Sequence, residues 1–380
     1  MHSNPFTDGE LERRVAATRK QMAARGLDMI LLSSPENIFY LIGLDHWGYF
    51  APTVLIVPAT GELTLITRAM EKVVIRNQVR NATFIGHTDS ETAADKVVAF
   101  LAGKTDGKAL GIEEWSSGLA YGMGAQIRDQ VTAGSWHDIT GMLDEMRLVK
   151  SAEEQVFMRQ AARSADAGTK AAIAAIHDGA LEADVAAECL AAMTRAGSTP
   201  PGFGPFLRPA DRMAEEHTSW GDGKHHEAVF LEIAGCVSRY NAPMGRLVNI
   251  GGISDEDAEM AEICIKAFDS TIAALKHGVA AKDVYNGWQS VVDAAGMPEY
   301  RRHHCGYLVG IGFPPSWTGG PRVTGLKHDS DMEMKEGMTF HMMSWFTETG
   351  RGNYFISNTV LLGPDGAEVL NDTPYGPHVA

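Results

Sequence analysis

The stretch LEIAGCVSRYNAPMGR, residues 231–246, places a single acidic side chain in an apolar run and then continues into a polar turn. Glu232 is that acid, and Arg239 and Arg246 follow it. Such a carboxylate could be a strand residue neutralised by an arginine, a metal ligand, or the centre of a reaction. Because the run is apolar, we expect Glu232 to be substantially buried. Burial raises a carboxyl pKa, whereas a nearby cation lowers it.

A lone histidine, His217, precedes Glu232 by fifteen residues. Because an imidazole titrates near pH 6.5, it can both accept and donate a proton at neutral pH. A carboxylate beside it could activate water, attack an electrophilic carbon or stabilise a cationic substrate. The pairs His225–His226 and His303–His304 resemble metal sites. We do not expect them to bind metal, because neighbouring side chains of an extended segment point to opposite faces.

The elements that must position these residues fall into two parts. Short β-branched runs alternate with helical stretches in the first part, which predicts an α/β domain over residues 1–145. From residue 146, amphipathic helices precede the strand-like stretch that holds Glu232. A helix capped by Ser254, a shorter helix and three strand-like runs follow it. This order predicts a mixed helical and β-sheet domain over residues 146–380.

Composition and charge exclude several classes of partner. The formal net charge of −15 argues against nucleic acid, because binding phosphates requires a basic face. No apolar run approaches the roughly 18 residues that a membrane span needs. The start, MHSNPFTDGELERR, lacks the apolar segment of a secretory signal, and the four cysteines lie far apart without a CxxC motif. These features predict a cytoplasmic protein with reduced, buried thiols.

Several motifs of the second part follow one another in an informative order. MRLVKSAEEQ begins a long helix at residue 146, and His217 and Glu232 follow it. A hairpin ending in arginine, GYLVGIG, a GM-x-F strand, TVLLGPDG and a final PYGP complete the series. In this order the motifs resemble the pita-bread family, which includes methionine and proline aminopeptidases, prolidases and creatinase. The resemblance spans essentially the whole chain and implies a creatinase-like N-terminal α/β domain before an α+β pita-bread catalytic domain.

The metal-binding positions depart from the peptidase pattern. Metallopeptidases of this fold bind two metal ions through two aspartates eleven residues apart, one histidine and two glutamates. The resemblance carries these positions onto Glu232, Pro243, Tyr307, Met343 and Ser357. Proline and methionine offer no hard oxygen ligand, and serine and tyrosine bind divalent ions poorly at neutral pH. One carboxylate cannot hold two divalent ions, so we expect no metal and no other cofactor.

The resemblance also implies roles for individual residues. His217 matches the histidine that transfers protons in metal-free creatinase. Beside this match, we expect Glu232 to add to the substrate carbon or to direct water onto it, and Tyr307 to hydrogen-bond to the substrate or the developing tetrahedral centre. The segment HWGYFAP, residues 46–52, corresponds to the part of creatinase that reaches the partner subunit's active site. We therefore expect a homodimer in which this segment supplies pocket residues. The candidate substrate-binding residues are Trp47, Tyr49, Phe50, Trp220, Arg239, Tyr240, Asn241, Arg246, Trp317 and Met343, with Trp345 as a further aromatic candidate.

Metal-free members of this fold act on small nitrogen compounds with a polarised C–N bond. The hairpin and GYLVGIGFPPSW look nearer to the ectoine hydrolase type than to creatinase. Asn241 stands where a histidine is expected, and Gly245–Arg246–Leu247 departs from the usual arginine–threonine step. The substrate therefore stays open among an amidine, a guanidino acid and an amide.

We predict a metal-independent hydrolase of a C–N bond in a small cationic or zwitterionic amidine or guanidino compound. Three alternatives remain from the residues alone. They are a metallo-aminopeptidase or prolidase, a lyase acting on a small zwitterion, and a non-catalytic protein of the same fold that binds small solutes.

Overall fold

The computed structural model describes residues 3–320 and 322–380 and divides into two compact units. Unit 1 contains the residues up to Arg147 together with Gly319 and Gly320, and unit 2 contains Leu148–Thr318 and Arg322–Ala380. The boundary in the chain thus falls two residues after the one expected from the sequence. Within the described residues, no helix combines the length and the apolar character needed to cross a membrane.

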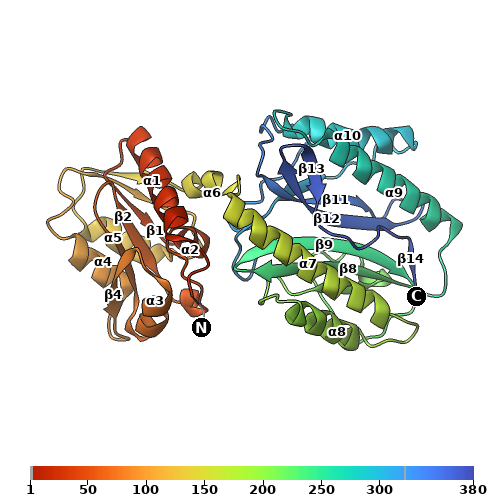
Figure 1. Cartoon of the computed structure of the whole chain (residues 1–380), viewed down its shortest axis with the longest axis horizontal. Helices are drawn as coiled ribbons and strands as arrows, with labels where there is room; N and C mark the ends of the chain where they lie inside the picture. Colours follow the sequence, from red (N-terminus) through yellow and green to blue (C-terminus); the bar gives the residue numbers. More distant parts are fainter. Residues whose placement is uncertain (1–2, 321) are drawn as a thin grey trace. The chain divides into compact units, whose positions relative to one another are not determined.

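Unit 1 is built on a six-stranded mixed sheet in the order β4-β3-β2-β1-β5-β6 (Figure 1). Strands β1, β2 and β3 run antiparallel, whereas the pairs β3/β4, β1/β5 and β5/β6 run parallel. Its elements are α1 (Asp8–Ala24), β1 (Met29–Leu32), α2 (Pro35–Ile42), η1 (Gly48–Phe50), β2 (Val54–Pro58), β3 (Leu63–Arg68), η2 (Ala69–Glu71), α3 (Lys72–Gln78), β4 (Ala82–His87), α4 (Ala93–Leu101), β5 (Ala109–Ile112), α5 (Tyr121–Gln130), β6 (Ser135–Asp138) and α6 (Met142–Arg147).

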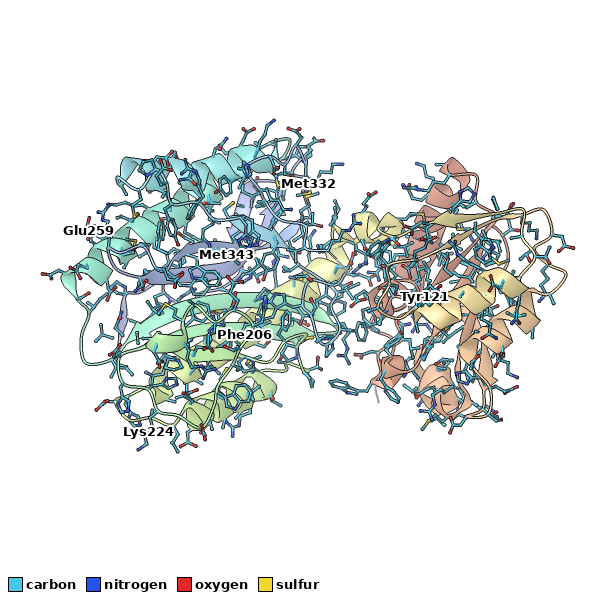
Figure 2. The ribbon with its side chains drawn as sticks, turned by 180° about the vertical axis from the view of Figure 1, so that it is seen from behind. Tyr121, Phe206, Lys224, Glu259, Met332 and Met343 are labelled. Atoms are coloured by element: carbon cyan, nitrogen blue, oxygen red, sulfur yellow. The ribbon has the colours of Figure 1, made fainter. Side chains whose placement is uncertain are left out.

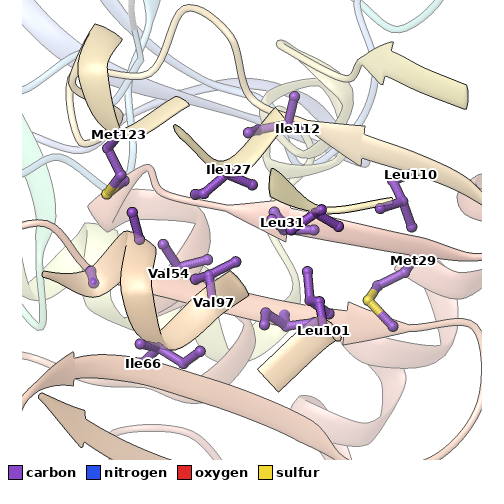
Figure 3. Close-up of a cluster of buried hydrophobic side chains, with 14 residues drawn as sticks. Met29, Leu31, Val54, Ile66, Val97, Leu101, Leu110, Ile112, Met123 and Ile127 are labelled. Atoms are coloured by element: carbon purple, nitrogen blue, oxygen red, sulfur yellow. The ribbon is translucent and has the colours of Figure 1, made fainter. Parts of the chain in front are cut away.

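One hydrophobic core of unit 1 lies between this sheet and the helices α4 and α5. Figure 3 shows Leu31, Val54 and Ile66 from three neighbouring strands facing Val97 of α4 and Ile127 of α5. Alternating side chains of the strands and one stripe of each helix therefore enter the same core. Neither α2 nor α5 was predicted from the sequence. The residues of α2, PENIFYLI, are almost all buried, so this helix has no polar face that would reveal its period.

Unit 2 is built on an eight-stranded sheet with a main path in the order β10-β11-β12-β9-β8-β7. Neighbours on this path are antiparallel, β13 pairs with β12, and β14 runs parallel to β9. Its elements are α7 (Ala152–Ala175), α8 (Glu182–Arg195), β7 (Phe206–Pro209), η3 (Ala210–Arg212), β8 (Ala228–Val237), β9 (Tyr240–Asn249), α9 (Asp255–Ala274), α10 (Ala281–Ala294), β10 (Gly306–Leu308), β11 (Thr339–Phe346), β12 (Tyr354–Gly363), β13 (Gly366–Val369) and β14 (His378–Val379).

Helices close one face of this sheet. Helix α7 lies along β8 and β9, and α9 lies along β11 and β12 (Figure 1). Helix α7 starts with a capping box, in which Ser151 Oγ accepts from the Glu154 N–H and Glu154 accepts from the Ser151 N–H. Gly235 lets α7 approach β8 closely, because a Cβ there would lie 2.0 Å from the Ala161 carbonyl oxygen. The opposite face of the sheet is left for the cavity described below.

We expect Gly235→Ala to destabilise unit 2 by about 3 kcal/mol or more, because the added methyl group meets the backbone of α7 rather than a flexible side chain. Urea unfolding followed by circular dichroism measures the change. Gly204→Ala is the matched control, because no atom lies within 4 Å of its added Cβ. Equal stability of the two variants would contradict the close approach.

Candidate active site

One face of the larger sheet brings together residues from six strands, because side chains alternate between faces along each strand. Residues directly opposite one another on neighbouring strands share a face. The pairs on this face are Glu232 with Phe206, Glu232 with Gly245, Tyr307 with His341, and Met343 with Ser357. In Figure 2, Phe206 and Met343 mark the two halves of the sheet that carry these pairs.

A cavity of about 340 Å³ opens on this face of unit 2. Its aromatic walls include Phe203, Phe206, Tyr307, Trp317 and Trp345. Its ionisable lining groups are Arg208, Glu216, His217, Glu232, His303, His304 and Lys327. Six of the residues selected from the sequence line this cavity, namely His217, Glu232, Tyr307, Trp317, Met343 and Trp345. The cavity is of a size that suits a small molecule.

The aromatic side chains form a wall around His217. Phe203 meets Trp317 edge-to-face with ring centroids 4.8 Å apart, and Phe206 meets Trp317 at 5.5 Å. The His217 ring lies 5.9 Å from Phe203 and 6.1 Å from Phe206. His217 itself has a φ of 59°, a left-handed conformation that is uncommon for a residue other than glycine. Such backbone conformations cluster at functional sites, where the surrounding structure holds them in place.

Glu232 is only 7% exposed, and no arginine forms an ion pair with it in the part of the chain that the structure describes. Burial raises its pKa to about 7, Arg208 opposes that rise, and Glu216 adds to it. The carboxyl group therefore changes charge close to neutral pH. A carboxyl with such a pKa is suited to accept a proton from water at physiological pH.

His341 is a central residue of this face that the sequence analysis did not select. It is fully buried, its Nδ1 lies 2.9 Å from the Tyr307 hydroxyl, and its Nε2 lies 2.7 Å from Ser357 Oγ. Burial, followed by the effect of His304, lowers its pKa to about 3, so the imidazole is neutral. Nε2 also lies 3.8 Å from Glu232, but a neutral ring at that distance forms no ion pair.

The hydrogen bonds among Trp317, Tyr307, His341 and Ser357 have directions that are set by which groups can donate. The Trp317 indole can only donate, and its Nε1 donates to the Tyr307 hydroxyl over 2.8 Å. The Tyr307 O–H then has His341 Nδ1 as its acceptor, which leaves the His341 Nε2–H to donate to Ser357. Burial also raises the pKa of Tyr307, so the phenol keeps its proton. The Tyr307 hydroxyl is therefore engaged with protein partners, whereas the sequence analysis expected it to bond to the substrate.

The five metal-ligand positions do not fit a pair of divalent ions. Glu232 is the one carboxylate among them, Pro243 and Met343 supply no hard oxygen, and Tyr307 and Ser357 are hydrogen-bonded to the neutral His341. Within residues 3–320 and 322–380, no group of three or more histidine, cysteine or acidic residues is arranged to hold a metal. The donor chemistry thus disagrees with the metal site of the peptidases.

The two histidine pairs differ from each other. His225 is buried, and His226 is exposed and bonds to Asp178, so their side chains point to different sides as expected. The rings of His303 and His304 instead lie 4.1 Å apart and both line the cavity. The expectation that this second pair points to opposite faces was wrong, because the chain bends at residue 303 and does not continue as a strand.

The hairpin residues selected from the sequence have structural partners outside the cavity. Tyr240 donates to Glu154 over 2.8 Å and stacks on Phe157. Asn241 accepts from the Gly202 N–H and donates to the carbonyls of Arg239 and Gly312, so it joins two loops to the hairpin. The Arg239 guanidinium lies 4.7 Å from the Phe313 ring centroid. None of Arg239, Tyr240 and Asn241 lines the cavity, contrary to the expectation of substrate contact.

Arg246 is also placed differently from the expectation. It is fully buried and donates to the carbonyls of Gly245, Ser357, Thr373 and Pro374 and to the Asn358 side chain. Burial lowers its pKa to about 10. Arg246 therefore does not pair with Glu232, although neutralisation by an arginine was one of the roles considered for that carboxylate. The reason is that Arg246 follows Gly245, the residue opposite Glu232, and so points to the other face of the sheet.

The remaining aromatic candidates lie elsewhere. Trp220 is exposed and does not line the cavity, contrary to the expectation. Trp47 and Phe50 belong to unit 1 and are 61% and 80% exposed, whereas the hydroxyl of the half-buried Tyr49 donates to the Leu44 carbonyl. Their contribution to a partner's site stays a prediction, as does the homodimer itself.

Three residues of the cavity were not predicted from the sequence. They come from the loop and strand before His217 and are Phe203, Phe206 and Arg208. Signals for them existed. Arg208 interrupts the apolar run GPFLRP, and His341 stands two residues before Met343, so that both share one face of their strand. Neither signal shows how deeply the side chain is buried, because burial depends on which strands pair with its own strand.

Comparison with known families agrees with this architecture. Residues 156–364 match the model of metallopeptidase family M24, and residues 14–149 match the creatinase/prolidase N-terminal domain. The chain belongs to metallopeptidase family M24. Its architecture is a creatinase-type N-terminal α/β domain followed by a pita-bread domain, as the motif order predicted.

Relatives of two kinds cover the whole chain. It is 26% identical to an ectoine hydrolase of Halomonas elongata over 98% of both chains. It is 23% identical to a Xaa-Pro dipeptidase of Pyrococcus furiosus over 96% of this chain and 99% of that one. A crystal structure of a prolidase from Thermococcus sibiricus superposes with a TM-score of 0.86 at 20% identity, covering 99% of this chain and all of that one. The chain is therefore a hydrolase of the M24 family.

We expect Glu232→Gln to change how stability depends on pH. A carboxyl with a pKa of about 7 in the folded chain and 4.5 in the unfolded chain binds its proton more tightly when folded, so wild-type stability falls as pH rises between these values. The glutamine variant lacks this loss, so its stability relative to wild type should increase by about 3 kcal/mol between pH 4 and pH 8. Urea unfolding at the two pH values tests this, with Glu227→Gln as an exposed control. A constant difference between variant and wild type would refute the raised pKa.

Proposed function

We propose that this chain is a metal-independent hydrolase that cleaves a C–N bond in a small cationic or zwitterionic amidine or guanidino compound. One observation carries the proposal. His217 and Glu232 line the same small cavity, while a neutral histidine, His341, is hydrogen-bonded to two of the positions that would have to hold metal ions. The relation to an ectoine hydrolase, which covers the whole chain, supports the same class of substrate.

The cavity has the chemistry that a small nitrogen cation requires. Aromatic faces attract cations, and Trp317, Phe203 and Phe206 surround the position of His217. Glu232 provides a buried carboxylate once it has lost its proton. An amidinium or guanidinium ion carries its own positive charge, so its central carbon is already electrophilic without a Lewis acid.

In the proposed reaction, Glu232 accepts a proton from water as the water oxygen forms a bond to the amidinium or guanidinium carbon. The resulting tetrahedral centre then breaks one C–N bond, and the departing nitrogen takes a proton from protonated His217. Tyr307 and His341 act as positioning residues, because their hydrogen bonds hold each other and Ser357 beside Glu232. Glu232 and His217 thus each transfer one proton, and Tyr307 and His341 hold the site in place.

A prolidase activity is the main competing function, because a Xaa-Pro dipeptidase is about as similar to this chain as the ectoine hydrolase. The residues at the metal-ligand positions argue against a prolidase activity. The peptidases use a carboxylate- and histidine-rich ligand set, and this chain has proline, tyrosine, methionine and serine at four of those five positions. No observation favours a lyase or a non-catalytic solute-binding protein.

We expect Glu232→Gln and His217→Ala each to lower kcat by about 10²- to 10⁴-fold, because each removes one proton-transfer group. A screen of cyclic amidines and guanidino acids for ring opening or nitrogen release identifies the substrate for this measurement. The kcat/KM of the wild type should fall as pH drops below about 7, where Glu232 becomes protonated. His226→Ala, at an exposed histidine that bonds to Asp178, is the control.

Added imidazole should restore part of the activity of His217→Ala, since His217 is exposed and its removal leaves space beside the substrate. Full turnover by either Glu232→Gln or His217→Ala would rule out the assignment. Incorporation of solvent oxygen from heavy-oxygen water separates hydrolysis from elimination, and a product without that oxygen would indicate a lyase.

We expect activity to survive dialysis against EDTA and 1,10-phenanthroline, because the ligand positions offer one carboxylate where five donors are needed. Elemental analysis of the purified protein gives the metal content, and a Pyrococcus prolidase treated in parallel is the control. Two tightly bound divalent ions per chain, with activity lost on chelation, would favour the metallopeptidase.

A further inference from the structure

Arg208 is a buried cation of the cavity to which the proposed reaction gives no role. It lies on β7, is 1% exposed and lines the cavity. Its guanidinium carbon lies 4.3 Å from the centroid of the Phe230 ring and 5.9 Å from that of Phe206. Burial lowers its pKa, although the pKa of an arginine is normally so high that the side chain keeps its charge. The fold thus holds a charged guanidinium at the cavity.

One edge of the Arg208 guanidinium is satisfied and the other is not. Nη1 donates to the carbonyls of Glu215 and Thr218, which flank His217. Nε and Nη2 have no hydrogen-bond partner in the described part of the chain. In a planar guanidinium the N–H of Nε and one N–H of Nη2 point the same way, and this pair is the fork that binds a carboxylate through two parallel hydrogen bonds.

The two acidic residues that line the cavity, Glu216 and Glu232, form no hydrogen bond to Nε or Nη2 of Arg208. Glu216 lies 3.6 Å from Arg302, and Glu232 has His341 as its nearest basic group at 3.8 Å. Leaving the donors of a buried charged group unpaired costs free energy, and proteins rarely accept that cost without a compensating function. A ligand that reaches the cavity with an oxyanion would supply the missing acceptors.

We infer that Arg208 is the binding site for the carboxylate of the substrate, so that the molecule cleaved is a zwitterion with its amidine or guanidine at Glu232 and its carboxylate at Arg208. The inference rests on the proposed function for the identity of the cationic group. Arg208 is opposite Phe230 in the strand pairing, and Glu232 is opposite Phe206, so the two charged residues are diagonal neighbours on one face. Diagonal neighbours lie about 7–8 Å apart, which suits a small amidine or guanidino acid placed between their side chains.

Binding of matched ligand pairs tests this inference. Each pair keeps the cationic group and removes the carboxylate: ectoine with 2-methyl-1,4,5,6-tetrahydropyrimidine, creatine with 1,1-dimethylguanidine, and guanidinoacetate with methylguanidine. Titration calorimetry in a His217→Ala background measures binding whether or not the ligand is turned over. We expect at least one zwitterion to bind about tenfold or more tightly than its partner, as a charge-assisted pair of hydrogen bonds implies.

Arg208→Gln in the same background should reduce this preference to about threefold or less, with the ligand that lacks a carboxylate bound about as before. Lys327→Gln is the matched control, because Lys327 is a second cation of the cavity but is exposed to solvent. We expect that variant to keep most of the preference. If Arg208→Gln does not fold, the paired ligands still test the inference in the parent protein. If the parent binds both members of every pair equally well, the inference is overturned.

Three other results would overturn it. The first is a preference that persists in Arg208→Gln or is lost in Lys327→Gln alone. The second is an equal loss of affinity for both members of a pair in Arg208→Gln. That result would mean that Arg208 acts only by holding the loop around His217. The third is that no zwitterion binds at millimolar concentration. Carboxylate-selective binding without turnover by the wild type would contradict the proposed hydrolase and leave the role of Arg208 standing.

Discussion

The cavity depends on one constraint, which is that polar groups on a buried sheet face must find hydrogen-bond partners. A buried group without a partner costs about 1–3 kcal/mol. Here a neutral imidazole meets the constraint, because His341 accepts from Tyr307 and donates to Ser357, with Trp317 completing the series. The M24 fold usually satisfies these positions with metal ions and their carboxylate and histidine ligands. In this chain the same backbone face is held by uncharged hydrogen bonds.

Two charged groups stay outside this uncharged network. Glu232 forms no ion pair with an arginine among the described residues, and burial moves its pKa to about 7. Arg208 has one edge bonded to the loop of His217, and its other edge has no acceptor in the part of the chain that the structure describes. His217 itself has a left-handed backbone. These features lower the stability of the folded chain and all lie at one cavity, which is the distribution expected when a protein retains local strain for function.

Much of the fold could be predicted because its segments are locally consistent. The helix capped by Ser254 and the strand-like runs that follow it were located from the sequence. Of GYLVGIGF only Gly306–Leu308 forms a strand, and α2 was not predicted, because nearly all of its residues are buried and no polar face reveals its period. The site was predicted in part, since His217, Glu232, Tyr307, Trp317 and Met343 share the cavity. Arg246 was assigned wrongly because a shift of one residue along a strand reverses the face, and Arg239 because it lies in the turn of the hairpin.

Residue types alone were enough to show that four of the five metal-ligand positions had changed, because proline, methionine, serine and tyrosine are poor ligands in any conformation. Motif order was likewise enough to assign the family. The folded chain alone revealed that His341 occupies the centre of the altered site and that Arg208 lines the cavity with two nitrogens that have no partner among the described residues. The physical reason is that burial and hydrogen bonding depend on which strands pair. Those pairings join β7 to β8 and β10 to β11, segments whose register no single stretch of sequence contains.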